Sequence, residues 1–484
     1  MKSPALKVRK KLAQYRETMF ASRSRFIVFL AFLTLLFFSG GGSRADIQSL
    51  LLLRPIAILV GMYAIFCLTR EDLKGRLFPL WFLGSLAVLM VVQLIPLPPA
   101  FWSQLPGREI IEDIAALSQL EPGWRPLSLS PAGTLNSLFS LTVPLAMVLL
   151  YLSLDSQYHK NTITIVIALC IISALWAVLQ LVGASRGPLY LYRITNFGSG
   201  VGLFANRNHQ AAVLALGITM LGWYAATLKP KARFHGFKFF GSVATIFVFI
   251  PLIIVTGSRA GLVLMVPALI FALMFFYFDF RKQAATGQRK PVLLINKISL
   301  PSHDKLLLIT GFVGIAAMAI LTIILSRSVA YDRLFAGNEI DELRIRLLPV
   351  LSGILLEYFP WGSGFGSFEH VYRIFEPQEF LNSTYLNHAH NDWMQFLIEG
   401  GLPVLVIGLC GAIWLGKQFW FLVRVSRAGR TARSAGFLCL ALMFILLAAS
   451  LVDYPLRVPS LVAIFALAAC LLGDMTRAAR HYAG

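Results

Sequence analysis

The sequence predicts an all-α, polytopic integral membrane protein, and two observations support that prediction. The chain has 484 residues, of which 57% are apolar, and its mean hydropathy is +0.72. Soluble domains of this total length cannot bury so much apolar surface. Apolar runs of about 20 residues, long enough to cross about 30 Å of hydrocarbon, recur from Phe26 almost to the C-terminus. We therefore expect about twelve transmembrane helices, at residues 26–42, 49–68, 77–97, 136–154, 162–184, 209–228, 239–256, 260–280, 306–327, 392–416, 434–452 and 457–475.

The positions of the cations predict how these helices are oriented. A net charge of +20 is large enough to suggest a nucleic-acid partner. The cations, however, gather near both termini and in alternate loops, which is the positive-inside pattern of a membrane protein. We therefore exclude nucleic acid and place both termini in the cytoplasm. Residues 1–25 form a basic N-terminus, residues 26–475 a single transmembrane domain and residues 476–484 a cytoplasmic tail.

Lysine and arginine are distributed differently on this topology. All of the lysines fall on the inner side, and arginine supplies every cation on the outer side. Arginine keeps its charge at any working pH, and its planar fork of donors matches phosphate oxygens two at a time. The distribution suits a phosphate site on the outer side, although the tendency of inner loops to collect lysine explains it equally well. The outer arginines are Arg44, Arg108, Arg125, Arg186, Arg193, Arg207, Arg259, Arg327, Arg333, Arg344, Arg346, Arg373 and Arg457.

The first apolar run allows two interpretations. Residues 26–38 are short for a membrane span, and the stretch Ser39–Ala45 resembles a signal-peptide cleavage region. The basic leader of residues 1–25 is long for a signal peptide, so we expect a retained anchor. Cleavage would leave the topology of the other helices unchanged.

Two external segments stand out between the predicted helices. The first, about residues 98–135, contains an amphipathic stretch with Ile110 and Ile114 and suggests a short helix at the membrane interface. Trp102 and Trp124 are expected to anchor it there.

The second external segment, about residues 328–389, is the longest such loop and precedes the tenth helix. We interpret it as a lid or wall of a site. Residues 340–356 repeat apolar side chains at helical spacing, and the glycine-rich stretch Pro360–Phe368 then predicts a flexible turn. No Gly-Lys-Ser/Thr follows these glycines and no strand precedes them, so a nucleotide-binding loop is excluded.

Two histidines lie immediately before the tenth predicted helix. Asn391 or Asp392 is a favourable N-cap, which places His390 at the outer end of that helix. The positive end of the helix dipole attracts a diphosphate and disfavours an imidazolium, so a neutral His390 can accept a proton. His388 is equally well explained as an interfacial polar residue.

Glu399 shares a helix face with Asp392 inside the bilayer, where a carboxylate is either functional or caps a neighbouring helix.

The segment around these histidines resembles a hallmark of the O-antigen ligase/polymerase family. His390-Asn391 is followed by nine residues and then by Gly401, which is similar to the family pattern His-(Asn/Ser/Gln)-x9-Gly-x-x-Gly. Val404 stands where the family often has its second glycine.

Three further segments are similar to elements of the same family. Gly202–Ala212 resembles its Gly-x-Phe-x-Asn-x-Asn-x-x-Ala element, and Thr256–Gly261 resembles its Ser-Arg-(Gly/Ala) turn. Ser450–Pro459 is similar to a late element of exopolysaccharide polymerases. Together the matches span about residues 190–460, and the resemblance implies a GT-C-like helical fold.

The resemblance also implies an activity and a set of site residues. The expected reaction transfers a glycan from a polyprenyl diphosphate to a sugar hydroxyl at the outer face. Arg259 is expected to neutralise the departing diphosphate and His390 to orient or deprotonate the acceptor hydroxyl, so these two are the catalytic candidates. An alternative for Arg259 is a snorkelling side chain or a pair with Asp453. The residues expected to bind diphosphate or glycan are Arg193, Arg207, Asn206, Asn208, Arg344, Arg346, His388, Asn391, Asp453 and Arg457.

We expect no metal ion, no other cofactor and no nucleotide-sugar donor. The outer acidic residues show no spacing typical of a Mg²⁺ site. The cysteines lie singly within predicted spans, which is typical of packing residues. They are Cys67, Cys170, Cys410, Cys439 and Cys470.

The expected location is the bacterial inner membrane, with the lipid bilayer as surroundings and the active site facing the periplasm. A polymerase adds the glycan to another lipid-linked repeat, whereas a ligase adds it to lipid A–core. The Ser450–Pro459 element and Val404 favour an exopolysaccharide or O-antigen polymerase, and a ligase stays the alternative. A lipid-linked oligosaccharide transporter is a third reading, but transporters place their polar groups near the midplane, and here they concentrate at one face.

Overall fold

The computed structural model describes residues 4–121, 123–229, 234–285, 339–381, 386–424 and 430–480. The predicted span at 306–327 and the first part of the predicted external loop, residues 328–338, lie outside the described residues. The side chain of Arg344 also lies outside them.

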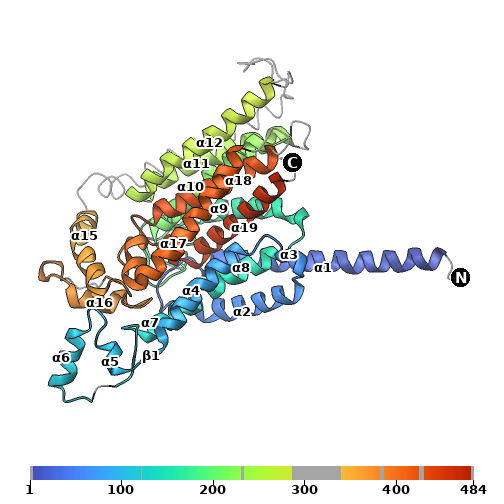
Figure 1. Ribbon diagram of the computed structural model, residues 1–484. Helices are drawn as coiled ribbons and strands as arrows, with labels where there is room; N and C mark the ends of the chain where they lie inside the picture. Colours follow the sequence, from blue (N-terminus) through green and yellow to red (C-terminus); the bar gives the residue numbers. More distant parts are fainter. Residues whose placement is uncertain are drawn as a thin grey trace.

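Within this described part, the protein is a bundle of long helices (Figure 1). The helices are α1 (Pro4–Ser39), α2 (Leu50–Cys67), α3 (Arg70–Leu73), α4 (Phe78–Leu94), α5 (Pro99–Trp102), α6 (Glu109–Leu117), α7 (Pro131–Ser140), α8 (Thr142–Leu152), α9 (His159–Val182), α10 (Arg207–Thr227), α11 (His235–Val255), α12 (Arg259–Ala285), α15 (Glu339–Tyr358), α16 (Phe368–Phe375), α17 (Asp392–Arg424), α18 (Arg430–Ala449) and α19 (Pro459–Arg480). Short 3-10 turns are η1 (Ser156–Tyr158), η3 (Gln378–Phe380) and η5 (Pro455–Arg457).

Ten helices of the described part are long and apolar enough to cross a membrane. The shorter apolar helix α4 coincides with the predicted span at 77–97. The all-helical membrane architecture is therefore confirmed, while the total of twelve spans and the GT-C-like arrangement stay predictions. We call the end of the bundle at which α17 and α19 begin the outer end, and the end at which these helices finish the inner end.

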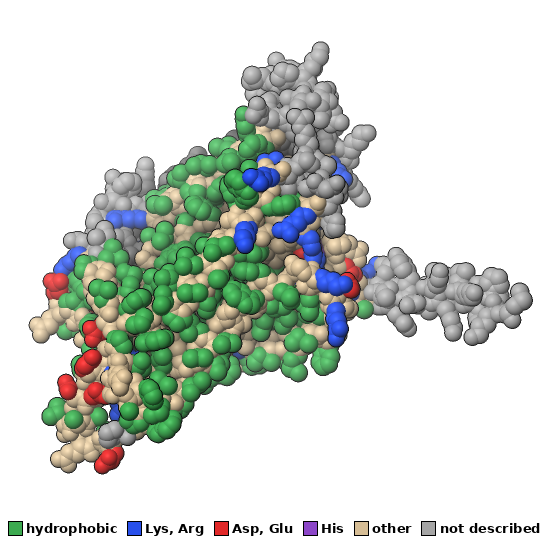
Figure 2. Space-filling model, viewed as in Figure 1, with side chains coloured by type: hydrophobic (Ala, Val, Ile, Leu, Met, Phe, Trp, Pro, Cys, Tyr) green, Lys and Arg blue, Asp and Glu red, His purple; other side chains and the backbone are tan. Residues whose placement is uncertain are grey.

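Charge separates the two ends of the bundle. Figure 2 shows hydrophobic side chains covering the flank of the helices, with Lys and Arg gathered toward the inner end and Asp and Glu toward the opposite end, near α6. This pattern matches the orientation that the positive-inside rule predicted from the sequence.

Helix α10 lies at the centre of the bundle. It packs against α9, α11, α12 and α18, and most of its side chains are buried. Small residues allow this close packing, because a Cβ added at Gly222 would lie 2.5 Å from the Cβ of Ala272 on α12. The first residue of α10 therefore has a fixed position relative to its neighbours.

Helix α1 is part of this packed core. Phe29, Phe32 and Phe37 are buried, and the carbonyl of Gly40 accepts hydrogen bonds from the backbone and the hydroxyl of Ser460, each 3.0 Å long. These contacts support a structural role for the segment that we expect to be a retained anchor.

The external segment before α7 forms a small module at the outer end. Strands β1 (Pro96–Leu97) and β2 (Arg125–Pro126) pair antiparallel, and α6 presents the exposed side chains of Ile110 and Ile114. The amphipathic helix is therefore confirmed, and its position at the membrane interface stays a prediction.

The role expected for Trp102 in this module is wrong. Its side chain is buried, and its indole Nε1 donates to the carbonyl of Pro126 over 3.0 Å. The guanidinium of Arg108 lies between the rings of Trp102 and Tyr358, 5.5 and 5.6 Å from their centroids, and burial lowers the pKa of Arg108 to about 10. Trp102 thus joins the module to α15 and does not face the membrane.

Candidate functional site

The carboxylate of Asp453 brings three of the sequence motifs together at the outer end of the bundle. Its Oδ2 accepts from the side-chain amide of Asn208 over 2.7 Å and from that of Asn206 over 3.4 Å. Its Oδ1 lies 3.3 Å from Nδ1 of His390 and accepts from the backbone N–H of Tyr454 over 3.0 Å. The segments at 202–212, 387–403 and 450–459 therefore meet at one side chain.

The fourth motif joins this network through Ser258. The Ser258 hydroxyl donates to Oδ1 of Asn208 over 2.7 Å and accepts from the backbone N–H of Gly261 over 2.9 Å. A Cβ added at Gly261 would collide with Ala211 of α10, so glycine is required for α12 to approach α10 here. Arg259, the first residue of α12, is consequently held next to the Asp453 network.

Asn206 and Asn208 hold the beginning of α10 in place. Asn206 is the N-cap residue, and its side-chain oxygen accepts from the backbone N–H of Asn208 over 2.9 Å. Asn196 accepts from the backbone N–H of Arg207 over 3.0 Å. Arg207 is thus placed on the first turn of α10, between two asparagines that bind Asp453.

Three histidines surround the ring of Tyr454. The ring centroids of His388, His390 and His209 lie 4.5, 4.9 and 5.3 Å from that of Tyr454. His209 also has its Nε2 3.9 Å from Oδ2 of Asp453. The outer end of α10 and the loops before α17 and α19 therefore share one aromatic and imidazole cluster.

His388 is a neutral imidazole within this cluster. Burial, reinforced by the charges of Arg457 and His390, holds its pKa well below the ordinary 6.5. Neither of its ring nitrogens has a hydrogen-bond partner among the described residues. A buried polar group in that state requires an explanation, and the capacity to bind an incoming hydroxyl provides one.

His390 is held at the start of α17 by its backbone. Its φ of +51° lies in the left-handed region, which costs a non-glycine residue energy and recurs at functional sites. Asn391 accepts from the backbone N–H of Met394 over 3.1 Å, so the predicted N-cap is confirmed at Asn391. The backbone N–H of Asp392 donates to the carbonyl of Ser450 over 2.8 Å, which ties α17 to the loop that contains Asp453.

Arg457 has a structural role in this arrangement. Its Nε lies 3.0 Å from Oδ1 of Asp392, and its Nη2 lies 3.1 Å from Oε2 of Glu399. Its guanidinium also covers the ring of Phe396, 5.0 Å from the centroid. Two carboxylates already compensate the charge of Arg457, so the diphosphate-binding role that we expected for it does not fit this geometry. The predicted shared face of Asp392 and Glu399 is observed.

The glycine-rich stretch Pro360–Phe368 forms a packed wall beside this ion-pair group. The backbone N–H groups of Ser363 and Gly364 donate to the carbonyls of Ile398 and Glu399 over 2.9 and 3.0 Å. Gln93 of α4 donates to the same Glu399 carbonyl over 3.0 Å and accepts from the Phe365 backbone over 3.0 Å. The flexible turn that we expected is wrong, because its polar backbone groups are bound to α17 and α4.

The motif glycine Gly401 interrupts α17. Its φ of +58° and ψ of −148° are not helical, and the next backbone N–H, that of Leu402, donates to the carbonyl of Pro360 over 2.7 Å. A Cβ at Gly401 would collide with that same carbonyl oxygen, which is why glycine occurs there. Val404, at the departure from the family pattern, is buried in a small core with Phe365 and Met90.

The other predicted arginines are divided between two places. Arg259 and Arg207 lie on the first turns of α12 and α10, next to the Asp453 network. Arg193 is exposed and lies near Asp46, whose pKa is lowered mainly by the hydrogen bond and charge of Arg44 and to a smaller extent by Arg193. Arg346 lies 3.2 Å from Glu379 and covers the ring of Phe380 at 5.0 Å. The structure does not bring Arg193 or Arg346 to His390.

Sequence reasoning missed His209, Tyr454 and Gln93. His209 and Tyr454 lie inside the motifs at 202–212 and 450–459. Each directly follows a predicted site residue, Asn208 or Asp453, and this position could have identified them. Gln93 is a polar residue near the end of an otherwise apolar predicted span, which is a signal of its own.

No group of three or more His, Cys, Asp or Glu side chains in the described ranges is arranged to hold a metal ion.

Comparison with known protein families gives one match. Residues 244–409, which include α12, α15, α16 and the first half of α17, match the family model described as O-Antigen ligase. No curated protein matches the chain. The family match supports the assignment to the O-antigen ligase/polymerase superfamily that the motifs predicted.

Proposed function

We propose that this membrane protein, which belongs to the O-antigen ligase/polymerase superfamily by the match over residues 244–409, is a glycosyltransferase of bacterial surface polysaccharide assembly. It transfers or polymerises a glycan from a polyprenyl-diphosphate carrier at the periplasmic face of the inner membrane. The observation that carries the proposal is the contact between His390 and Asp453 at the place where α10, α12, α17 and α19 all begin.

His390 acts as the general base in this proposal. With Nδ1 3.3 Å from the Asp453 carboxylate, the ring is oriented as in carboxylate–histidine pairs, and Nε2 becomes the proton acceptor. The acceptor hydroxyl oxygen forms a bond to carbon one of the donor sugar, and its proton goes to Nε2. The bond between carbon one and the diphosphate oxygen breaks, and its electron pair leaves with the polyprenyl diphosphate.

The leaving diphosphate is stabilised by cations and helix dipoles. Arg259 and Arg207 supply the guanidinium groups, and the N-terminal N–H groups of α10 and α12 add positive potential at the same end. A pre-arranged set of donors is worth more in the transition state than the same groups in water. Because arginine compensates the charge, we expect activity in purified membranes to survive chelation of divalent cations, and loss restored by Mg²⁺ would contradict this.

A polymerase is the favoured acceptor class, with a ligase as the alternative. The Ser450–Pro459 element supplies Asp453 and Tyr454 to the site, and Val404 replaces the second glycine of the family pattern. These two features favour a polymerase over a ligase.

Glycan chain-length analysis in a deletion strain tests the proposal. Loss of polymer with single repeats still attached supports a polymerase, and accumulation of complete lipid-linked polymer supports a ligase. Wild-type chain length and attachment in the deletion strain would reject both. The test is completed by restoring the phenotype with the wild-type gene and not with an Asp453→Asn variant of equal abundance.

A further inference from the structure

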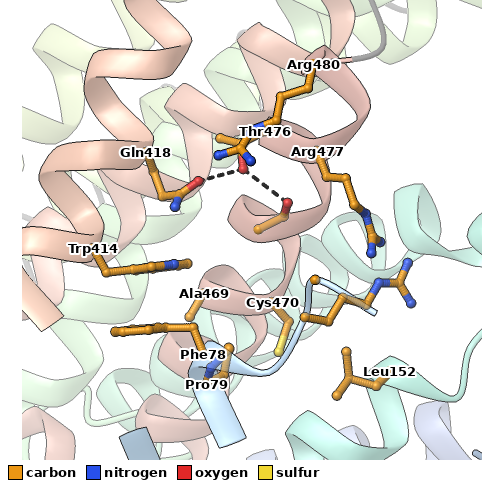
Figure 3. A pocket seen from close by; sticks show the side chains of 13 residues that line it. Phe78, Pro79, Leu152, Trp414, Gln418, Ala469, Cys470, Thr476, Arg477 and Arg480 are labelled. Atoms are coloured by element: carbon orange, nitrogen blue, oxygen red, sulfur yellow. Dashed lines mark hydrogen bonds between the residues drawn. The ribbon is translucent and has the colours of Figure 1, made fainter. Parts of the chain in front are cut away.

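A cavity with basic side chains in its wall lies at the inner end of the bundle, far along the helices from His390. Its volume is about 130 Å³, and it lies between the start of α4, the end of α8 and the inner parts of α17 and α19 (Figure 3). Arg76, Arg477 and Arg480 line it together with the side chains of Gln418 and Thr476. Its apolar walls are formed by Phe78, Pro79, Leu152, Trp414, Ala469 and Cys470.

The cavity has an excess of positive charge. Arg76 and Arg477 share the carboxylate of Asp474. Nε of Arg76 lies 2.7 Å and Nη2 of Arg477 lies 2.8 Å from its Oδ1. Its Oδ2 accepts from the Tyr151 hydroxyl over 2.9 Å and lies 3.4 Å from His159. One carboxylate therefore offsets one of two guanidinium charges, before Arg480 is counted.

Gln418 supplies an amide side chain to the cavity wall. Its side chain is more than nine-tenths buried, with 8% of its surface exposed. Its oxygen accepts from the Thr476 hydroxyl over 2.6 Å. In Figure 3 the Gln418 side chain points from α17 toward α19, into the space above Trp414. The side-chain amide therefore contributes a polar group to the wall of the cavity.

The apolar and basic walls of the cavity together suit a lipid headgroup and the start of its chains. Trp414 stacks on Phe78 with 4.5 Å between centroids and 4° between planes, and Trp414 lies on the membrane-spanning part of α17. The basic side chains are at the ends of helices, where lipid headgroups lie. The volume accommodates a phosphate with part of a glycerol and is too small for a nucleotide.

We propose that this inner cavity binds the phosphate headgroup of an anionic phospholipid from the adjacent leaflet. Arg480 and Arg76 face the phosphate oxygens, the Gln418 amide donates to one of them, and the acyl chains leave along Trp414 and Phe78. The proposal is independent of glycosyl transfer, because none of these residues belongs to the site at His390.

Native mass spectrometry of the purified full-length protein tests the proposal. We expect the wild-type protein to retain one phosphatidylglycerol about tenfold more tightly than phosphatidylcholine, because both lipids carry the same phosphodiester and the arginines repel the quaternary ammonium of choline. Arg480→Gln and Gln418→Leu should each lose that preference while melting at nearly the wild-type temperature. The matched control is Arg424→Gln, because Arg424 is an exposed arginine at the same end whose guanidinium covers Trp420 and does not line the cavity.

Three outcomes would overturn the proposal. An equal loss in Arg424→Gln would indicate general attraction to the basic end. Equal retention of both lipids by the wild-type protein would indicate that no anionic headgroup is selected. Displacement of the lipid by millimolar inorganic phosphate would indicate a site for a soluble anion.

Discussion

The two ends of the bundle each contain a buried aspartate with a histidine beside its carboxylate, and the two carboxylates differ in their other partners. At the inner end Asp474 binds two arginines, a tyrosine hydroxyl and His159, so its charge is matched by strong donors. At the outer end the Asp453 carboxylate accepts from the side-chain amides of Asn206 and Asn208 and lies 3.3 Å from the imidazole of His390.

The partners of a buried carboxylate indicate whether its role is structural, as we infer for Asp474, or catalytic support, as we infer for Asp453. A carboxylate bound by guanidinium groups holds helices together, and removing it leaves buried charges without a partner. A carboxylate bound by amides and an imidazole orients a group that can still exchange a proton.

The largest effect is expected at His390. Removing a general base costs about 10²–10⁴-fold in rate, so His390→Ala should abolish polymer while its abundance in the membrane is unchanged. Glycan analysis and immunoblotting of the same membranes measure the two quantities. His370→Ala is the matched control, because His370 is exposed on α16. Normal polymer from His390→Ala would end the catalytic assignment.

The opposite behaviour is expected at Asp474. Asp474→Asn leaves Arg76, Arg477 and His159 without their carboxylate, and breaking a buried ion pair in this way costs about 3 kcal/mol or more of stability. Thermal unfolding of the purified protein in detergent should shift to lower temperature, while activity per folded molecule stays near wild type. An unchanged melting temperature combined with lost activity would reverse the roles assigned to the two aspartates.

A smaller effect separates charge from geometry at Arg259. Lysine keeps the positive charge and removes the bidentate fork, so Arg259→Lys should lose about 10-fold or more in activity at normal abundance if the diphosphate is bound through paired hydrogen bonds. The matched control is Arg346→Lys, whose guanidinium pairs with Glu379. Activity equal to wild type in Arg259→Lys would show that charge alone is sufficient there.

The smallest effect concerns pH. The pKa of His388 is well below its ordinary 6.5 in the folded protein, so above pH 6.5 the imidazole is neutral in both states and does not affect stability. Below that pH the unfolded chain binds the proton first, and the folded state loses up to about 1.4 kcal/mol per pH unit until the folded pKa is reached. Melting temperatures between pH 7.5 and 5 should therefore fall less steeply in His388→Asn than in the wild type. Equal slopes would show that His388 is not a buried neutral imidazole.

The sequence predicted the helices and the convergence of the motifs well, because both depend on local pattern. Apolar runs of about 20 residues and the positions of lysines determine spans and orientation without knowledge of packing. Which polar residue contacts which could not be predicted. Arg457 looks like a phosphate-binding residue in the sequence, and its two carboxylate partners on α17 become evident only once α17 and η5 are packed together.

The same limit explains the glycine-rich stretch. Three glycines within five residues suggest flexibility in the sequence, and in the structure Gly362, Gly364 and Gly366 all have positive φ. The backbone N–H groups of Ser363 and Gly364 donate to carbonyls that the interruption of α17 leaves without helical partners. The stretch is therefore ordered by a helix about 35 residues later in the chain. Tertiary packing therefore decides whether a glycine-rich segment is a flexible turn or an ordered, packed wall.

The break at Gly401 makes the nine-residue spacing of the motif a rotational constraint. Each residue added to an α-helix turns everything beyond it by about 100°. Asp392 and Glu399 are seven residues apart, so they return to almost the same azimuth and can bind one guanidinium. A single residue inserted between Asp392 and Glu399 would rotate Glu399 by about 100° relative to Asp392 and move the non-helical position off the carbonyl of Pro360. The length of the interval, more than the identity of the residues inside it, is therefore what this part of the molecule has least freedom to change.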